Sequence, residues 1–319
     1  MGAGAVGCFV GGKLAAHVEH VTFVGRRAHG ITLAGLDEPT VVVPDVDMRT
    51  EAAALAGSDV VLVAVKSGQT EATGRELATV IPRDALVVSL QNGIRNAERL
   101  RESMPEHTVA GGIVEFNVVA EDGVFRRGTT GGLVVEEVEH RAFDGLVAAL
   151  RATGLSLDVA RDFRAKQWTK LVINLSNALG ALCDRPTRAM LFDPALRAVL
   201  RAVVMEALDV LAAAKVPLAR IGRLPVRAFP VLLGLPTPLF ALLARAQLRV
   251  DPAARSSMWQ DLSRGRLTEI EELNGEIVRL ARSIDRRAPW NEHLAKLVHA
   301  AEGKGPPGLG AAALRPSRA

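Results

Sequence analysis

Hydrophobic positions in the first half of the chain alternate between short continuous runs and helical spacing. Three runs rich in Val and Leu, at 21–24, 59–65 and 85–90, have the composition of strands buried on both faces of a sheet. Helical spacing separates them, at about 51–56 and 70–80. This alternation predicts an α/β fold in which helices connect the strands of a parallel sheet.

From residue 108 the pattern changes to short apolar runs spaced by glycines and charged turns. Runs at 111–116, 117–120 and 132–137 predict antiparallel strands that extend the sheet. A helix at about 141–153 and a last strand at 155–160 follow them.

After residue 161 the strand pattern vanishes and helical spacing takes over. It covers about 163–182, 194–214 and 257–284. We therefore expect two domains, 1–161 and 162–302, followed by a loose tail rich in Gly and Pro at 303–319.

Composition and charge narrow the class of protein. With 49% hydrophobic and 23% charged residues, the 319-residue chain is typical of globular proteins. Its formal excess of +4 is scattered and aromatic residues make up 4%, so we expect no nucleic-acid partner. The most apolar stretch, 229–243, contains three prolines and is too short to span a membrane. Cys8 and Cys183 form neither a metal nor a disulfide pattern, which favours a reducing, cytoplasmic location.

The chain starts with a Gly-rich motif of the form G-x-G-x-x-G. Gly2 would allow a tight turn, Gly4 a close approach of a pyrophosphate, and Gly7 the packing of the following helix. That helix would direct its first residues, Ala5 and Val6, at the phosphates of a dinucleotide. A Gly/Ala-rich start without function is the alternative, and the αβ units that follow favour the motif.

This motif ordinarily follows the first, central strand of its sheet, yet nothing precedes Met1. We expect Met1 to be an internal methionine of a longer native chain whose upstream residues form that strand. A truncated, non-functional chain is the competing interpretation.

Two arginines, Arg26 and Arg27, follow the second strand, where an NAD site would have an acidic residue. A guanidinium matches a phosphate, so the pair favours NADPH over NADH. A solvated turn is the alternative. Lys66 and Asn92 follow the next two strands, at the carboxyl edge where such sheets bind ligands. A surface lysine and a plain Asn-Gly turn are their alternatives.

A polar stripe runs along an otherwise apolar helical segment in the second half. At about 100° per residue, Asn174 lies about 40° and Asn177 about −20° from Lys170. A lysine there could protonate a ketone oxygen as hydride arrives, and the amides could bind a polar substrate. A polar face turned to water is the alternative.

Further along, Ser257 opens a helical run that Gly265 breaks. Thr268 and Glu271 then fit a capping box at the start of another helix. Glu269 lies between them without a capping role, and a surface acid near a helix start is the alternative to a functional one.

With these residues in place, five segments in order resemble the ketopantoate reductase (2-dehydropantoate 2-reductase) family. They are GAGAVG, VKSGQT, QNG, WTKLVINLSNAL and SSMWQDLSRGRLTEIEELNG. The resemblance implies a Rossmann-type NADP-binding domain, then an all-helical domain like that at the C-terminus of 6-phosphogluconate dehydrogenase, with the active site between them. It implies NADPH-dependent reduction of 2-dehydropantoate to (R)-pantoate, a step toward pantothenate and coenzyme A.

The resemblance also implies roles for individual residues. Lys170 would be the general acid, Glu269 its acidic partner, and Ser257 the group that receives the substrate carboxylate. Asn174 would bind substrate, and Lys66 and Asn92 would be the cleft residues at the strand ends.

Besides the missing first strand, two departures from the family pattern leave the substrate open. Asn177 comes seven residues after Lys170 rather than eight, and Ala254 stands where the family often has an asparagine. The Pro-rich stretch 216–238 could reshape the helical domain. A reductase of another 2-oxo acid is therefore the first alternative. An NADPH sensor without turnover is the second, and the presence of both Lys170 and Glu269 argues against it. A homodimer stays open.

Overall fold

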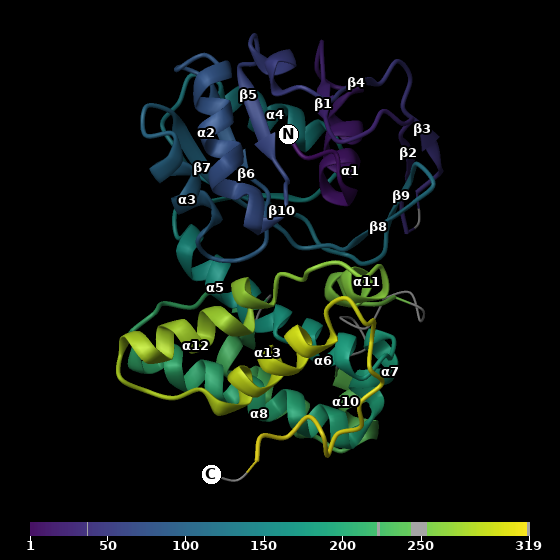
Figure 1. Cartoon of the computed structure of the whole chain (residues 1–319), viewed down its shortest axis with the longest axis vertical. Coiled ribbons are helices and arrows are strands. Elements are labelled where there is room, and N and C mark those ends of the chain that lie inside the picture. The colour runs from purple at the N-terminus through teal and green to yellow at the C-terminus, as the bar shows by residue number, and fades with distance from the viewer. Residues whose placement is uncertain (37, 222–223, 244–253, 318–319) are drawn as a thin grey trace. The chain divides into compact units, whose positions relative to one another are not determined.

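The computed structural model describes residues 1–36, 38–221, 224–243 and 254–317 (Figure 1). The chain divides into two compact units, Met1–Phe163 and Arg164–Ala319, where the sequence pattern placed a boundary at 161. Residues 222–223 of the Pro-rich stretch and 318–319 of the tail lie outside the described residues. No helix in the described ranges is both long and apolar enough to cross a membrane.

The main sheet of the first unit confirms the α/β fold with its parallel strands. Its strand order is β11-β10-β7-β6-β5, with β6 parallel to both of its neighbours. Two of the three runs expected to form antiparallel strands of this sheet do so, since β7 and β10 pair antiparallel. The last strand, β11, runs parallel to β10. The strands span Val60–Val63 (β5), Leu86–Ser89 (β6), Thr108–Val114 (β7), Leu133–Glu136 (β10) and Leu157–Ala160 (β11).

Helices bury both faces of this sheet, which explains the continuous Val/Leu runs. Val87 of β6 belongs to one core, and its neighbours Leu86 and Val88 belong to the other, as the alternation of strand side chains requires. The Val87 core includes residues of α2 and α3, and the other core includes residues of α1 and α4. These helices are Ala5–Leu14 (α1), Thr70–Val80 (α2), Asn96–Ser103 (α3) and Phe143–Ala152 (α4), and the predicted helix at 51–56 is a single 3-10 turn, η1 (Ala52–Leu55).

The first residues of the chain lie between two strands. The amino group of Met1 donates to Leu62 O at 2.8 Å, and Met1 O accepts from Ala64 N at 2.9 Å beside β5. On the other side, Gly2 N donates to Val24 O at 2.9 Å at the end of β1 (Thr22–Val24). β1 pairs in parallel with β4 (Asp47–Arg49). The upstream strand stays a prediction.

A second sheet contains strands that the sequence pattern did not separate. Its order is β3-β2-β9-β8, so the run at 117–120 does not extend the main sheet as expected. It becomes β8 and pairs with β9, which in turn pairs with β2. These strands are too short for a periodic pattern to predict them. Their bounds are Thr32–Ala34 (β2), Val41–Val42 (β3), Val118–Glu121 (β8) and Val124–Arg127 (β9).

Helices dominate the second unit, as expected. The longest, α8, begins where Asp193 accepts hydrogen bonds from Ala195 N and Leu196 N and Pro194 takes the first helical position. Around it lie α7, α12 and α13, which pack against it. The helices of its described residues are α5 (Phe163–Asn174), α6 (Ser176–Leu182), α7 (Thr187–Phe192), α8 (Pro194–Ala213), α9 (Phe229–Leu233), α10 (Thr237–Leu243), α11 (Ser257–Ser263), α12 (Asn274–Ser283) and α13 (Pro289–Ala301).

Two details of the second unit differ from the sequence expectation. A two-stranded hairpin, β12 (Arg220–Ile221) and β13 (Leu224–Pro225), lies in the region expected to lack strands. The described part of the tail is not loose, because Leu309 N donates to Leu182 O at 2.8 Å and Leu314 is fully buried. The prediction of a loose tail, made from local composition, was therefore wrong for the described residues of the tail, because long-range contacts hold them in place.

Candidate functional site

The Gly-rich turn has the geometry that its three glycines predict. Gly2 adopts φ +94°, and a Cβ there would lie 2.6 Å from Val65 N. A Cβ on Gly7 would lie 2.2 Å from Gly2 O, so the helix packs against the turn only without a side chain. A Cβ on Gly4, by contrast, would meet nothing within 4 Å. The open position is the one at which the motif brings a pyrophosphate close to the backbone.

The start of α1 offers unused backbone donors beside this open position. The first intrahelical bond runs from Cys8 N to Gly4 O, and no side chain caps the helix at Gly4. The N–H groups of Ala5, Val6 and Gly7 precede that bond, and such groups together with the helix dipole favour an anion. The residues of this turn therefore fit the diphosphate of a dinucleotide.

Arg26 and Arg27 lie next to the Gly-rich turn. A Cβ on Gly25, which precedes them, would lie 2.6 Å from the Cβ of Ala3, so the two segments touch. Both arginine side chains are exposed. Two exposed guanidinium groups beside a turn that fits a diphosphate can bind a further phosphate.

A buried hydrogen-bond network joins the carboxyl ends of β5 and β6. The amide nitrogen of Gln91 donates to Val65 O at 3.0 Å and to the Thr70 hydroxyl at 2.7 Å. That hydroxyl donates to the amide oxygen of Asn96 at 3.0 Å, and Asn96 Nδ2 donates to Ser67 Oγ at 2.9 Å. Sequence reasoning missed this network, although its polar residues follow directly on two buried strands.

The network fixes the loops that carry Lys66 and Asn92. Lys66 is exposed and directly precedes η2 (Ser67–Gln69), while Asn92 is half-buried and its carbonyl accepts from Asn96 Nδ2. Gly93 has φ +97°, so this Asn-Gly pair does form a turn. Both side chains thus follow neighbouring parallel strands at one edge of the sheet.

The polar stripe of the second unit lies on two helices rather than one. α5 ends at Asn174, Leu175 separates it from α6, and α6 contains Asn177. The prediction of one helix over 163–182 is therefore wrong, although Leu175 itself keeps helical φ −58° and ψ −21°. Lys170, Asn174 and Asn177 are all half-buried, as is Ile173, whereas the other apolar residues between them, Leu171, Val172 and Leu175, are buried.

Ser257 is brought beside this stripe by the residue before it. The Ser256 hydroxyl donates to Asn177 O at 3.1 Å and accepts from Trp259 N at 3.1 Å, so it caps α11 and joins it to α6. Asp184 reinforces the joint, because its Oδ1 accepts from the Trp259 indole nitrogen at 2.7 Å. Ser257 itself is half-buried at the first position of α11.

Glu269 lies in a segment whose polar contacts differ from the predicted capping box. Thr268 N and Thr268 Oγ1 each donate to Glu302 Oε1 at 2.8 Å, so Glu302 replaces Glu271 as the reciprocal acid. Glu271 instead contacts His299 Nε2 at 2.8 Å. The segment then forms a 3-10 turn, η4 (Ile270–Glu272), before α12 begins at Asn274, and Glu269 is half-buried.

Metal and thiol chemistry find no support in the described residues. They contain no group of three or more His, Cys, Asp or Glu side chains that could hold a metal ion. Both cysteines are free and buried, and burial raises the pKa of the Cys8 thiol to about 12. A thiol with such a pKa is a poor nucleophile at neutral pH.

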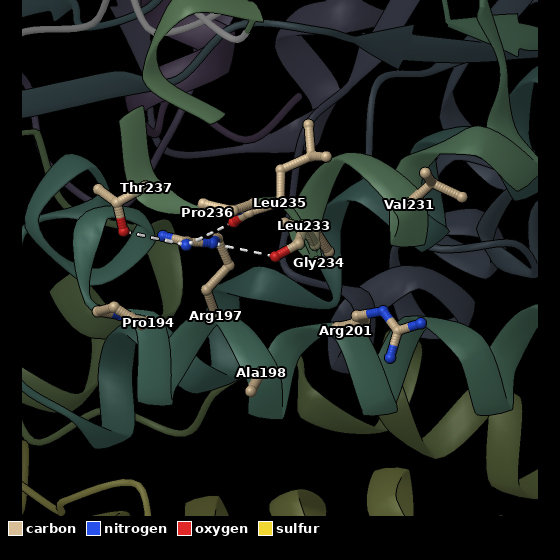
Figure 2. Close-up of a pocket in the computed structure, with 10 residues that line it drawn as sticks. All are labelled: Pro194, Arg197, Ala198, Arg201, Val231, Leu233, Gly234, Leu235, Pro236 and Thr237. Atoms are coloured by element: carbon tan, nitrogen blue, oxygen red, sulfur yellow. Dashed lines mark hydrogen bonds between the residues drawn. The ribbon is translucent and has the colours of Figure 1, made fainter. Parts of the chain in front are cut away.

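Residues of α8 and of the Pro-rich stretch line a pocket (Figure 2). Arg197 of α8 points into it, yet its donors reach Leu233 O, Leu191 O and Leu235 O at 2.9–3.0 Å. These carbonyls belong to the ends of α7 and α9 (Phe229–Leu233) or follow them, where orphan carbonyls attract a cation. Arg197 therefore holds the Pro-rich stretch onto α8, and its guanidinium donates to backbone carbonyls of the protein.

Comparison with known proteins decides the family. Residues 1–140 match the family model described as Ketopantoate reductase PanE/ApbA, and residues 162–302 match its C-terminal model. A 2-dehydropantoate 2-reductase of Halobacterium salinarum is 31% identical over 95% of this chain and 98% of that protein. The chain belongs to the ketopantoate reductase family. The family accounts for both units, since its two models fall on either side of the division near residue 163.

Solved structures agree with the family assignment. A ketopantoate reductase of the PanE/ApbA family from Ralstonia eutropha JMP134 superposes with a TM-score of 0.79 and 32% identity, covering 95% of this chain and 97% of that one. A D-mandelate dehydrogenase, solved with NADH and anilino(oxo)acetate, has a TM-score of 0.74 and 21% identity, covering 94% and 96% of the two chains. The latter likeness shows that the fold is shared.

Proposed function

We propose that this protein reduces 2-dehydropantoate to (R)-pantoate with NADPH. The observation that carries the proposal is the arrangement of Lys170, Asn174 and Ser257 in a member of the ketopantoate reductase family. Ser256 joins the helix that begins with Ser257 to the carbonyl of Asn177, next to the polar stripe. This arrangement supports a site that binds a polar acid and protonates it.

The cofactor in this proposal binds to the first unit. Gly2, Gly4 and Gly7 shape the turn, and the N–H groups of Ala5 and Val6 bind the diphosphate. Arg26 and Arg27 bind the 2′-phosphate, which is why we propose NADPH rather than NADH. Lys66 and Asn92 orient the nicotinamide end. When bound, the reduced nicotinamide supplies a hydride to the ketone carbon.

Lys170 supplies the proton that balances this reaction. As the ketone carbon gains hydride, negative charge develops on the keto oxygen, and the ammonium group of Lys170 donates a proton to it. The products are the alcohol and a neutral amine, which regains a proton from solvent. Glu269 keeps the ammonium group charged and oriented. Ser257, Asn174 and Asn177 bind the substrate carboxylate and hydroxyl groups by hydrogen bonds.

A reductase of another 2-oxo acid is the second candidate. Ala254 has no side-chain amide, unlike the asparagine common at this position in the family. Its backbone carbonyl accepts from Thr187 N at 2.9 Å. Asn177 lies on α6, beyond the break at Leu175. Both differences concern substrate recognition and leave the proton donor in place. Location in the cytoplasm and assembly as a homodimer stay predictions.

Two substitutions of Lys170 test the mechanism. Lys170→Ala should lower kcat by about 10²-fold or more, because a general acid is lost. Lys170→Arg keeps the positive charge, but its pKa is too high for proton donation, so kcat should fall by a similar factor. NADPH affinity, measured by fluorescence titration, should stay within about twofold in both. Wild-type turnover in either variant would show that Lys170 is not the acid.

A further inference from the structure

Four side chains close a polar cluster around the residues that flank Glu269. Glu302 Oε1 accepts from both the backbone and the hydroxyl of Thr268, and Glu302 Oε2 lies 3.1 Å from His299 Nδ1. His299 Nε2 lies 2.8 Å from Glu271 Oε1. We call Thr268, Glu271, His299 and Glu302 the α13 clamp. It holds the segment before Glu269 and the segment after it to one end of a single helix.

The position of Glu302 argues for a role beyond local stability. Glu302 is the C-cap residue of α13, where a carboxylate opposes the helix dipole. Its side chain is only 12% exposed. Partial burial works to raise its pKa, but the hydrogen bonds from Thr268 and His299 outweigh burial, so the pKa of Glu302 lies below its usual range. The Glu302 carboxylate is thus placed where both the helix dipole and partial burial disfavour a negative charge.

His299 can satisfy both carboxylates only as the cation. Each ring nitrogen faces a carboxylate oxygen, and an imidazole donates from both nitrogens only when it is protonated. The hydrogen bond to Glu271 is the main cause that raises the pKa of His299, against partial burial. Since His299 lies in the last turn of α13, its charge also complements the helix dipole.

The other charged groups near His299 come from three elements packed against α13 and from α13 itself. Arg279 of α12 lies 3.9 Å from Glu271 Oε2, and Glu272 of η4 is buried. Glu206 of α8 binds the opposite end of α13, at Trp290 N and Asn291 N. On α13 itself, Lys296 pairs with Glu292 at 3.4 Å. The helix α6 also packs against α13, but it contains no charged side chain. Glu271 and Glu302 are therefore the acids that respond directly to His299.

We propose that Glu302 is a positioning residue for Glu269, acting through Thr268, and that protonated His299 holds Glu302 and Glu271 in place for that purpose. This inference rests on the proposed role of Glu269. The clamp fixes the backbone on both sides of Glu269, because Thr268 Oγ1 also accepts from Ile270 N at 3.3 Å. A displacement of about 1 Å at such a residue can cost about 10²-fold in rate.

A double-mutant cycle on kcat tests this coupling. Glu302→Ala should lower kcat by about tenfold, while KM for NADPH stays within about twofold. In a Glu269→Gln background the same change should alter kcat by less than about twofold, because its effect passes through Glu269. Glu302→Gln, whose amide oxygen still accepts from Thr268, should keep kcat within about threefold of wild type.

Control variants separate positioning from loss of structure. Glu292→Gln removes a carboxylate of the same helix that pairs with Arg282 at 3.0 Å, away from Thr268, and should leave kcat unchanged. If Glu302→Ala does not fold, Thr268→Val removes only the hydroxyl contacts and should lower kcat about threefold by itself and not in the Glu269→Gln background.

Two outcomes would overturn the inference, and they differ. Wild-type kcat in Glu302→Ala, or an equal loss in both backgrounds, would remove the positioning role and leave Glu269 as proposed. Wild-type kcat in Glu269→Gln would instead remove the proposed role of Glu269, and the positioning role with it.

Discussion

The Gly-rich turn and the segment that carries Glu269 are built by opposite means. In the turn, side chains are absent where atoms come closest, and a Cβ on Gly7 would lie 2.2 Å from Gly2 O. In the Glu269 segment, hydrogen bonds join side chains that are far apart in the sequence. Glu302, for example, accepts two hydrogen bonds from Thr268 at 2.8 Å. One region is shaped by backbone approach and the other by polar side-chain contacts.

This difference decides how each region responds to change. A site made by backbone approach tolerates no added atom at a packed glycine, yet it has few side chains to lose. A site made by polar contacts tolerates isosteric changes that keep the contacts, and it responds to pH through its ionisable groups. The following substitutions test that contrast, in order of decreasing effect.

Gly7→Ala should destabilise the first unit by about 3 kcal/mol, because overpacking forces the helix away from the turn. Gly4→Ala should leave the free energy of unfolding within about 0.5 kcal/mol, since its Cβ would meet nothing within 4 Å. Urea unfolding measures both values. NADPH titration should show weaker binding in the Gly4→Ala variant, by about tenfold, if the open position faces the cofactor. Equal stability of the two variants would contradict the backbone account of this turn.

Gln91→Leu tests whether side chains also matter at the strand ends of the first unit. Gln91 is 8% exposed, and its loss removes the bonds to Val65 O and to the Ser89 hydroxyl. The Thr70 hydroxyl loses the bond from Gln91 and keeps the one to Asn96. We expect the free energy of unfolding to fall by about 2 kcal/mol. Gln69→Leu, at a nearby exposed position, should change it by less than about 0.5 kcal/mol. If the two variants unfold alike, the network carries no stability.

The double variant Arg26→Ala/Arg27→Ala tests the side-chain contribution to cofactor choice. Both arginines are exposed, so folding should be unaffected. The Kd for NADPH should rise by about tenfold, the scale of one lost charge-assisted contact, while the Kd for NADH stays unchanged. Isothermal titration with both cofactors measures the ratio. A parallel loss for NADPH and NADH would place the 2′-phosphate elsewhere.

The pH dependence of stability tests the α13 clamp, with the smallest expected effect. The raised pKa of His299 gives a stabilisation that is complete below its usual 6.5 and is lost as pH rises through the folded-state pKa. The lowered pKa of Glu302 gives one that is complete above its usual 4.5 and is lost as pH falls through its folded-state pKa. Both are therefore present at about pH 5.5, between those two ordinary values.

Urea unfolding of wild type and His299→Gln at pH 5.5 and pH 9 measures this effect. At pH 5.5 the free energy of unfolding of wild type should exceed that of His299→Gln by under about 1 kcal/mol, because the partners are partly exposed. At pH 9 the two proteins should be equally stable. An identical difference at both values would show that protonated His299 does not hold the clamp.

The fold and the shape of the Gly-rich turn could be predicted from the sequence because their signals are local. The three glycines lie within six residues, and β6 is apolar up to its last residue, Ser89. The α13 clamp was not readable, since Thr268 and Glu302 are 34 residues apart and a local partner, Glu271, fitted the capping pattern equally well. Periodicity also could not detect the break at Leu175, whose φ −58° and ψ −21° remain helical.

The central claim is that a 2-oxo acid is reduced here and that 2-dehydropantoate is the acid preferred. The most direct measurement is kcat/KM by NADPH consumption with 2-dehydropantoate and with phenylglyoxylate, the 2-oxo acid that corresponds to mandelate. The account predicts a preference for 2-dehydropantoate of about 10²-fold or more, the discrimination expected of a site whose polar groups pair with one substrate. Tight NADPH binding without turnover of 2-dehydropantoate would contradict it.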